Sequence, residues 1–407
     1  MSLSEISFDV IREMNEFRNQ LSLIKRIGFF FGAGTSMSLG ISGIKVLTEK
    51  VEQNLGDKEK KIYLQIKESL KVHLESSEIT IEDILNQLRL IRQITRNNEK
   101  KDYEGINGKI AKHLDAEICN SIYKVISEEA KSIDLTIMKQ LMSWINWLSR
   151  DFTKELFTTN YDLIFEKAME SLQIPYFDGF VGANEPFFLP ESIECNTHEE
   201  FPPLSWIRLW KLHGSFGWFW RKNSAGEHQR VVRLGELAKC SKVENDELVI
   251  YPSREKYELS RKQPFIAYFD RLKRYLNEKE GLFIISGYSF SDEHINEIFF
   301  NSLKQNNRLH IIAFLYSNDD MAKLQICGCN SYLNFTAFGP DEAIIGGNFG
   351  KWNIDEKIIK EEPLKVLSFW NIQKKHFKLG DFKEMVSFLI EICGKKVIVE
   401  KEIAVLK

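Results

Sequence analysis

A glycine-rich segment near the start of the chain, Gly32-Ala33-Gly34-Thr35-Ser36, contains residue types that suit phosphate binding. Glycines let backbone N–H groups approach a pyrophosphate closely, and the N-terminus of a following helix favours negative charge. The full G-x-G-x-x-G pattern is not met, because Met37 stands where the third glycine belongs. Two interpretations therefore stay open for this segment, a nucleotide site and a plain turn between a strand and a helix.

A second polar segment, Thr158-Thr159-Asn160-Tyr161-Asp162, offers an amide and a carboxylate two residues apart. The amide both donates and accepts hydrogen bonds, whereas the carboxylate accepts them. Such a pair can orient a polar substrate. The alternative is an Asx-type helix cap, because a helical pattern follows at once.

His213 lies in a third segment, Lys211-Leu212-His213-Gly214-Ser215. Histidine is the natural group for proton transfer near neutral pH, so His213 is a candidate general base. An isolated histidine is more often structural, and this second interpretation also stays open.

The fourth segment, 286–292, combines Gly287 with hydroxyl side chains and an acid. Gly287 permits close approach of the backbone to a ligand, and the hydroxyls of Ser289 and Ser291 are able to bond a phosphate or a ribose. Alternatively, Ser291 or Asp292 caps the helix that follows.

Each polar segment comes directly after an apolar run that predicts a buried strand, and these runs are 27–31, 156–159, 208–212 and 282–285. A further strand is predicted over 310–316. Helical patterns alternate with these strands, over 163–172 and from Asp292 onward, which favours an α/β fold with a Rossmann-like, doubly wound parallel sheet. The polar segments would then meet at one edge of the sheet, where open α/β sheets bind ligands.

The chain divides into three parts by composition. Residues 46–150 lack proline and carry helical patterns after a capping-box-like start at Thr80, so we expect a helical module inserted into the α/β domain. The α/β domain itself would cover 1–45 and 151–340. The tail, 341–407, is assigned to packing or assembly. We further expect helices over 8–24 and 380–393, and loops over 94–113 and 183–206.

Composition excludes several classes of protein. The formal net charge is −3, which argues against binding of nucleic acid through a basic surface. No apolar stretch approaches the ~18–20 residues of a membrane span, and residues 1–19 do not resemble a secretory signal. We therefore expect a cytoplasmic protein. The six cysteines include no C-x-x-C pair, so neither a disulfide scaffold nor a zinc site is expected.

Three motifs, taken in order, resemble those of the sirtuin NAD-binding fold. They are Gly32-Ala33-Gly34-x-Ser36 with Gly40-Ile41, Thr158-x-Asn160-x-Asp162 and His213-Gly214-Ser215. The forms Thr-Thr-Asn-Tyr-Asp, Leu-His-Gly-Ser and Gly-Tyr-Ser-Phe-Ser-Asp-Glu-His-Ile resemble the bacterial sirtuin-like NADases of anti-phage defence. The resemblance covers about 25–45 and 151–320.

The resemblance implies a role for each matching residue. Asn160 would orient the nicotinamide ribose or the attacking water, Asp162 would contact the nicotinamide carboxamide, and His213 would act as general base. The residues implied to bind the rest of NAD are Gly32, Ala33, Gly34, Thr35, Ser36, Thr159, Gly287, Ser289 and Asn318. Of these, Gly32, Ala33, Gly34 and Ser36 belong to the implied pyrophosphate cradle, and Asn318 matches a later adenosine contact.

Two departures separate this sequence from the deacylase sirtuins. Those enzymes carry a Pro-Asp-Phe-Arg run where this chain has Ser42-Gly43-Ile44-Lys45, and a four-cysteine zinc module where 214–285 contains a single cysteine, Cys240. The resemblance therefore favours cleavage of NAD by water, giving nicotinamide and ADP-ribose, with no zinc. NAD-dependent deacylation and non-catalytic binding of NAD or ADP-ribose are the alternatives, and a nuclease ranks lower because no cluster of metal-binding acids is evident.

An NADase that defends bacteria by NAD depletion must be silent at rest, which implies control by a partner or by assembly. The roughly 65 residues after 340 are too few for a fused sensor domain of about 100–150 residues. We therefore expect a separate partner, for which the resemblance points to a HerA-type hexameric ATPase, and a homo-oligomer of this chain. The sequence does not distinguish linear from cyclic ADP-ribose as the product.

Overall fold

A computed structural model describes residues 6–24, 26–73, 78–148, 151–194, 202–222, 228–234, 247–250, 263–361 and 363–392. Within these residues, ten strands form one large sheet in the order β1-β17-β16-β15-β14-β13-β2-β5-β9-β6. Neighbouring strands run parallel, except that β16 is antiparallel to both β15 and β17. The strands are β1 (Ser7–Asp9), β2 (Ile27–Phe31), β5 (Lys154–Thr158), β6 (Tyr176–Phe177), β9 (Ile207–Lys211), β13 (Gly281–Ser286), β14 (Leu309–Phe314), β15 (Phe335–Phe338), β16 (Glu342–Ile345) and β17 (Asn348–Asn353).

The sheet is doubly wound, as the sequence predicts. From β2 the chain moves outward to β5 and β9, and later returns to the other side of β2 to form β13, β14 and β15. The strand order therefore reverses between β2 and β13, which is the point where open α/β sheets bind ligands. The predicted fold class is confirmed, and the predicted strands over 27–31, 156–159, 208–212, 282–285 and 310–316 match β2, β5, β9, β13 and β14.

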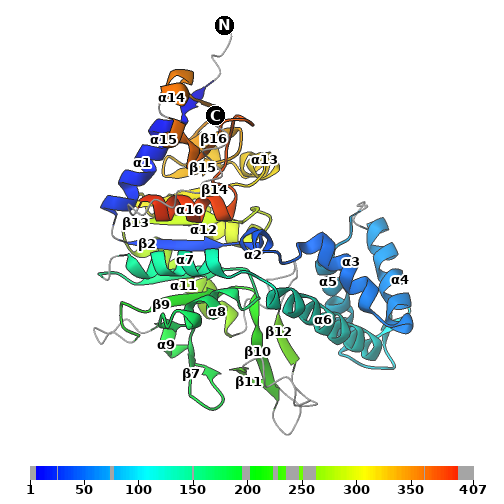
Figure 1. Cartoon of the computed structure of the whole chain (residues 1–407). Coiled ribbons are helices and arrows are strands. Elements are labelled where there is room, and N and C mark those ends of the chain that lie inside the picture. Colours follow the sequence, from blue (N-terminus) through cyan, green and yellow to red (C-terminus); the bar gives the residue numbers. More distant parts are fainter. Residues whose placement is uncertain are drawn as a thin grey trace.

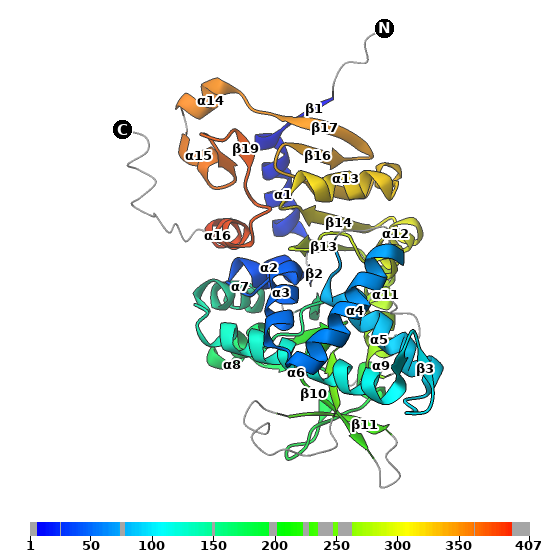
Figure 2. The same cartoon turned by 90° about the vertical axis from the view of Figure 1, so that its right-hand side faces the viewer.

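Helices cover both faces of the sheet because side chains alternate along each strand. On β2, Phe29 and Phe31 point to one face and Phe30 to the other. The first face packs against α1 (Val10–Leu23), α7 (Thr136–Trp147), α8 (Ile164–Ser171) and α16 (Phe382–Ile392), and the second against α11 (Phe265–Glu278), α12 (Glu293–Gln305) and α13 (Asn318–Ile326). Figure 2 shows the two helical layers on either side of the strands.

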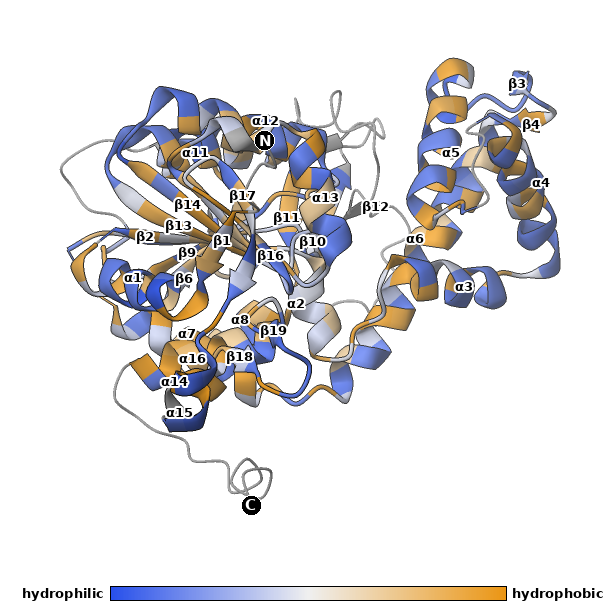
Figure 3. Cartoon of the chain, turned by 90° about the horizontal axis from the view of Figure 1, so that it is seen from above, coloured by the Kyte–Doolittle hydropathy of each residue, from blue (hydrophilic) through white to orange (hydrophobic). Residues whose placement is uncertain are grey.

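Four helices form a bundle that projects from one side of the sheet (Figures 1 and 3). They are α3 (Ile44–Asn54), α4 (Asp57–His73), α5 (Ile81–Thr95) and α6 (Gly108–Lys131), and they pack through apolar faces that include Leu88 and Ile118. The capping box predicted at Thr80 is present, where Asp83 accepts from the Thr80 backbone N–H at 2.9 Å. The loop predicted over 94–113 is instead a short hairpin of β3 (Asp102–Tyr103) and β4 (Ile106–Asn107) followed by the first turn of α6.

A second, smaller sheet has the strand order β12-β10-β11-β8-β7. No sequence pattern predicted it, and parts of it fall in the segment 183–206 that was expected to be a loop. Its elements are β7 (Phe180–Val181), β8 (Phe187–Phe188), β10 (Gly214–Lys222), β11 (His228–Arg233) and β12 (Glu247–Ile250), with the short helix α9 (Glu191–Glu194) beside it. Strand β10 begins directly after His213, so the candidate base lies where the two sheets meet.

The C-terminal part extends the large sheet through β16 and β17, and β1 pairs with β17. The remaining elements are η2 (Cys329–Ser331), α14 (Glu356–Glu361), α15 (Pro363–Leu367), β18 (Trp370–Asn371) and β19 (His376–Phe377). Helix α7, inside the predicted module, packs against α8 and α16, two helices that cover one face of the large sheet. The domain boundaries at 45/46, 150/151 and 340/341 stay predictions, and residues 393–407 of the predicted tail lie outside the described residues.

Candidate functional site

The four polar segments meet at the carboxyl edge of the large sheet. Strand register puts Ser286, Phe31, Thr158 and Lys211 side by side as the last residues of β13, β2, β5 and β9. Each of the four segments begins at or directly after one of these residues, so residues more than 250 positions apart in the sequence become neighbours. Figure 1 shows the short helix α2 (Ala33–Ser38) at this edge, after β2.

The glycines of the first and fourth segments are required for contact between the two loops. The Gly32 N–H donates to the Ser286 carbonyl at 3.0 Å, and the Gly34 N–H donates to the Gly287 carbonyl at 2.8 Å. A Cβ on Gly32 would lie 2.4 Å from the Gly287 oxygen, and Gly287 itself has φ +66°. Their predicted role in holding a pyrophosphate stays a prediction, because both N–H groups donate to carbonyls of the protein here.

Asn160 is the centre of a buried hydrogen-bond cluster. Its Nδ2 lies 3.1 Å from the Gly32 carbonyl, 3.0 Å from Thr35 Oγ1 and 2.9 Å from Ser36 Oγ. Ser36 Oγ in turn donates to Asp162 Oδ2 at 2.7 Å. The glycine segment and the Asn-Tyr-Asp segment are therefore one connected unit, as expected for residues that act on a single ligand.

Asp162 also caps a helix, since its Oδ1 accepts from the Ile164 N–H at the start of α8, at 3.0 Å. The helix-cap interpretation that the sequence left open therefore applies to Oδ1, and the role of this carboxylate toward a substrate stays a prediction. Its side chain is buried, with 4% of the residue exposed. Cap and hydrogen bond together hold the carboxylate in one orientation toward Ser36.

His213 is paired with a residue that the sequence identified as a helix cap. Its Nε2 lies 3.1 Å from Asp292 Oδ2, and both side chains are largely buried. Because a carboxylate only accepts hydrogen bonds, Nε2 is the donor, and a neutral imidazole then keeps its acceptor lone pair on Nδ1. Asp292 Oδ1 accepts from the His294 N–H at the start of α12. A carboxylate that orients a histidine in this way is a common support for a general base.

The remaining predicted binding residues lie at the same edge but outside this cluster. Thr159 follows β5 and donates its N–H to the Phe31 carbonyl, and Ala33 is exposed at the start of α2. Ser289 Oγ lies 3.1 Å from Ser291 Oγ. Asn318 begins α13 and donates to Asp341 at 2.6 Å, so the structure does not bring its side chain to Asn160 or His213.

The helical bundle is fastened to the site through α6. Glu129 accepts from the Ser42 N–H at 2.8 Å and pairs with Lys50 Nζ at 2.7 Å. Burial alone would raise the pKa of Glu129, but hydrogen bonds from Lys50 and Ser42 outweigh it and lower the pKa. Ser42 is the first residue of Ser42-Gly43-Ile44-Lys45, the stretch that differs from the deacylases. Glu129 of the bundle therefore holds the backbone of this stretch in place through Ser42.

An aromatic chain makes a second link between α6 and the site. The rings of Tyr123 and Phe216 lie 5.3 Å apart, and those of Phe216 and Tyr161 lie 5.0 Å apart, both edge to face. Tyr161 stands between Asn160 and Asp162, and Phe216 follows the His-Gly-Ser segment. Helix α6 therefore packs on Phe216, directly after the His-Gly-Ser segment, and Phe216 packs on Tyr161 of the other segment.

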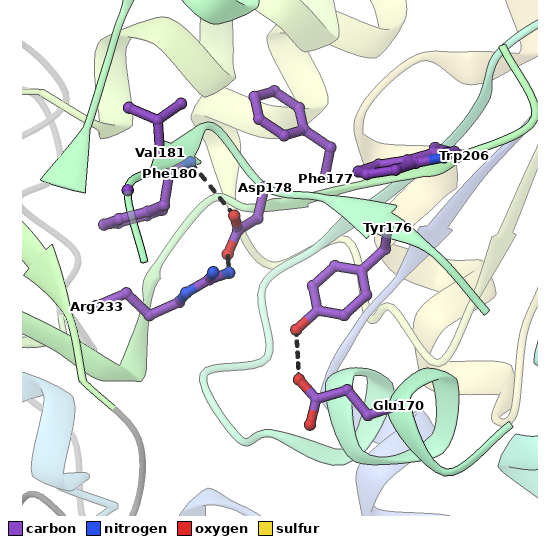
Figure 4. A pocket seen from close by; sticks show the side chains of 9 residues that line it. Glu170, Tyr176, Phe177, Asp178, Phe180, Val181, Trp206 and Arg233 are labelled. Carbon is purple, nitrogen blue, oxygen red and sulfur yellow. Dashed lines mark hydrogen bonds and ion pairs between the residues drawn. The ribbon is translucent and has the colours of Figure 1, made fainter. Parts of the chain in front are cut away.

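A cavity of about 460 Å³ lies elsewhere in the molecule (Figure 4). Tyr176 and Trp206, which line it, belong to the amino ends of β6 and β9, whereas the candidate site is at the carboxyl ends. Its polar groups are paired with one another, since Arg233 bonds Asp178 and Tyr176 donates to Glu170 at 2.8 Å. The cavity therefore has no part in the candidate site.

Sequence reasoning identified Asn160, Asp162 and His213 but missed the pairing of His213 with Asp292. The sequence placed Asp292 at the same edge, after a predicted strand, but it gave no sign that Asp292 would face His213, because that depends on the order of the strands in the sheet. Within the described residues, no group of three His, Cys, Asp or Glu side chains is arranged to hold a metal ion. Cys195, Cys240 and Cys393 lie outside those residues.

None of the helices in the described part of the chain is both long and apolar enough to cross a membrane.

Residues 154–334 match a family model described as a SIR2-like domain. The SIR2-like match contains Asn160, Asp162, His213 and Asp292, and it begins after the glycine segment. It covers less than half of the chain and includes neither the helical bundle nor the tail. A comparison with curated proteins gave no match.

Solved structures of Sir2 proteins share low identity with this chain. A Sir2 homologue mutant in complex with ADP-ribose is 10% identical, with 74% of this chain and 84% of that chain covered and a TM-score of 0.32. A Sir2 homologue mutant in complex with 2'-O-acetyl-ADP-ribose has the same identity and coverage and a TM-score of 0.33. A Sir2 mutant with a p53 peptide and NAD is 13% identical, with 74% and 86% covered and a TM-score of 0.30.

Proposed function

We propose that this protein hydrolyses NAD at the bond between nicotinamide and ribose. The observation that carries the proposal is the arrangement at the carboxyl edge of the sheet. Asn160, Ser36 and Asp162 form one hydrogen-bonded unit, and His213 is oriented by Asp292 beside it. The SIR2-like match over 154–334 supports the coarser part of the proposal, that the site binds or processes NAD.

The reaction adds water across a glycosidic bond, so nicotinamide leaves and the ribose carbon gains a hydroxyl. His213 would accept the proton of the attacking water, which is the usual task of a positioned imidazole near neutral pH. Asn160 would orient the ribose or the water, and Asp162 would accept a hydrogen bond from the carboxamide of the leaving group. Positive charge develops on the ribose as the bond breaks, so positioning and a buried carboxylate nearby both assist.

The biological role is also a proposal and rests on the resemblance in the sequence. The chain would deplete NAD in infected bacteria, and it would be held inactive until a partner or an assembly activates it. A homo-oligomer and a separate HerA-type hexameric ATPase are the proposed partners. The contacts of helix α6 support control of the activity from outside the α/β domain. A partner that moved α6 would also move the loop at Ser42 and Phe216, because α6 contacts both.

The test is NAD turnover by the chain co-purified with its native partner, and by the chain alone. We expect nicotinamide and ADP-ribose to appear in equal amounts as NAD disappears, and the His213→Ala and Asn160→Ala variants to reduce the rate by about 10²-fold or more. If both variants consume NAD at the wild-type rate, the catalytic assignment is wrong. Chromatography of the product distinguishes linear from cyclic ADP-ribose.

An acetyl-lysine peptide separates hydrolysis from deacylation in the same assay. Hydrolysis predicts nicotinamide release at the same rate with and without peptide. Release that depends on the peptide would support a deacylase instead, and binding of NAD without release of nicotinamide in the activated complex would support a regulatory binding module.

A further inference from the structure

Lys211 is the last residue of β9, and its side chain is almost completely buried, with 1% of the residue exposed. Its ammonium group touches three partners. It donates to the Asp162 carbonyl, to Glu166 Oε1 at 2.5 Å and to Ser215 Oγ at 3.3 Å. Burying a lysine is costly unless its charge is paired and its donors are used, and here the three N–H groups have three acceptors.

The three acceptors come from both halves of the candidate site. Asp162 belongs to the segment after β5, which carries Asn160. Ser215 belongs to the segment after β9, two residues beyond His213. One ammonium group therefore ties together the two loops whose side chains must act on the same bond.

Backbone contacts between the two loops are sparse. The Leu212 N–H donates to the Thr158 carbonyl at 2.8 Å, and the Phe216 N–H donates to the Tyr161 carbonyl at 2.9 Å. Between these two bonds lie His213 on one loop and Asn160 on the other. Lys211 adds a third connection through its side chain, to the Asp162 carbonyl directly after this interval.

We propose that Lys211 is a positioning residue, which fixes the distance between the Asn160–Asp162 loop and the His213 loop. The proposal rests on the proposed function. A displacement of about 1 Å between reacting groups costs up to about 10²-fold in rate, so loss of this bridge affects catalysis more than substrate binding.

Glu166 supplies the counter-charge. Burial raises the pKa of its carboxyl, and the nearby Lys211 ammonium opposes that rise. Removing only the lysine leaves a buried carboxylate without its cation, which is strongly destabilising, whereas removing both charges is often tolerated. The double variant Lys211→Met/Glu166→Gln therefore removes the bridge without leaving an uncompensated charge.

The chain offers a matched control. Lys154 is also buried, with 2% exposed, but it lies at the amino end of β5, where its Nζ donates to the Asn146 carbonyl at 3.2 Å. Lys154→Met removes a buried lysine from the same sheet without touching either loop.

The experiment measures kcat and KM for nicotinamide release from NAD by the activated complex, with the melting temperature of each variant. We expect the double variant to melt near the wild-type temperature and to lose about 10²-fold in kcat, while KM changes by less than about threefold. Lys154→Met should keep the wild-type kcat. A double variant with wild-type kcat, or an equal loss in Lys154→Met, would overturn the proposal.

Hydrogen exchange keeps this test separate from that of the proposed function. If the wild-type protein releases no nicotinamide, the proposal of NAD hydrolysis is wrong. The link that Lys211 makes between the two loops is still measurable by the exchange rates of their amides. The double variant should then exchange faster than wild type in both 159–163 and 212–216, and Lys154→Met should not. Unchanged exchange in these two segments would exclude Lys211 as the link.

Discussion

Asp292 contacts two groups through two different oxygens. Its Oδ2 faces His213 Nε2, and its Oδ1 accepts from the first turn of α12. The helix therefore holds the carboxylate still, and the carboxylate in turn holds the imidazole. Truncation of the Asp292 side chain to alanine would therefore give an ambiguous result, because it would remove the helix cap and the partner of His213 together.

Asp292→Asn separates the two tasks at the residue scale. Asparagine is as good an N-cap as aspartate, so we expect a melting temperature near that of the wild type. The amide carries no charge to hold the Nε2 proton, and we expect kcat for NAD hydrolysis to fall by about 10²-fold. Initial rates of nicotinamide release measure the effect. Wild-type activity in this variant would show that the pairing has no part in the reaction.

Residue types at strand ends made part of the site predictable. Asn160, Asp162 and His213 were identifiable because each is a polar residue directly after an apolar run. The pairing of His213 with Asp292 and the bridge by Lys211 were not, because they depend on which strands become neighbours in the sheet. One sequence read alone gives the strands but not their order.

At the scale of elements, two loops are packed closely enough to require glycine on both sides. A Cβ on Gly287 would lie 2.5 Å from the Thr35 nitrogen. Sequence reasoning assigned these glycines to a ligand, and the structure shows that they also let the loops after β2 and β13 touch. Strands β7 and β8 of the small second sheet were missed for a different reason, since they are two residues long and too short to show a periodicity.

Gly287→Ala tests this packing against a control glycine with nearly the same φ angle. Gly287 has φ +66° and Gly328 has φ +69°, but a Cβ on Gly328 would meet nothing within 4 Å. The left-handed backbone costs alanine about 1–2 kcal/mol at either position. We expect Gly287→Ala to lower the free energy of unfolding by roughly 1–3 kcal/mol more than Gly328→Ala, because overpacking adds to the cost. Urea titration measures both, and equal losses would contradict the packing argument.

At the scale of the whole molecule, a buried ion pair lies at the opposite edge of the sheet from the candidate site. Glu155 is fully buried and accepts from Arg271 Nε at 2.9 Å and from Trp210 Nε1 at 2.9 Å. Burial alone would raise the pKa of Glu155, but the attraction of Arg271 and these hydrogen bonds outweigh it and lower the pKa to about 2. The pair joins β5, β9 and α11.

This pair predicts an acid limit to stability. A carboxyl whose pKa is lower in the folded state than in the unfolded state stabilises the fold. The stabilisation is complete above the unfolded pKa, near 4.5, and it is lost as the pH falls toward 2. Glu155→Gln should lower the free energy of unfolding by about 3–5 kcal/mol at pH 7, because Arg271 stays buried without its carboxylate. Its stability should also depend less on pH between 5 and 2. Urea titrations at several pH values check this, with the exposed Glu280→Gln as control, and a wild-type pH profile in Glu155→Gln would contradict it.

The arrangement of the site has a consequence for synthesis of the protein. The glycine segment, Asn160, His213 and Asp292 leave the ribosome in that order, and the strand before Asp292, β13, pairs with β2, which is made among the first. A nascent chain lacks the partner of His213 until β13 and the start of α12 have emerged. An NADase built in this way would be harmless to the cell that makes it through most of its translation, and fragments that end before β13 would be inactive.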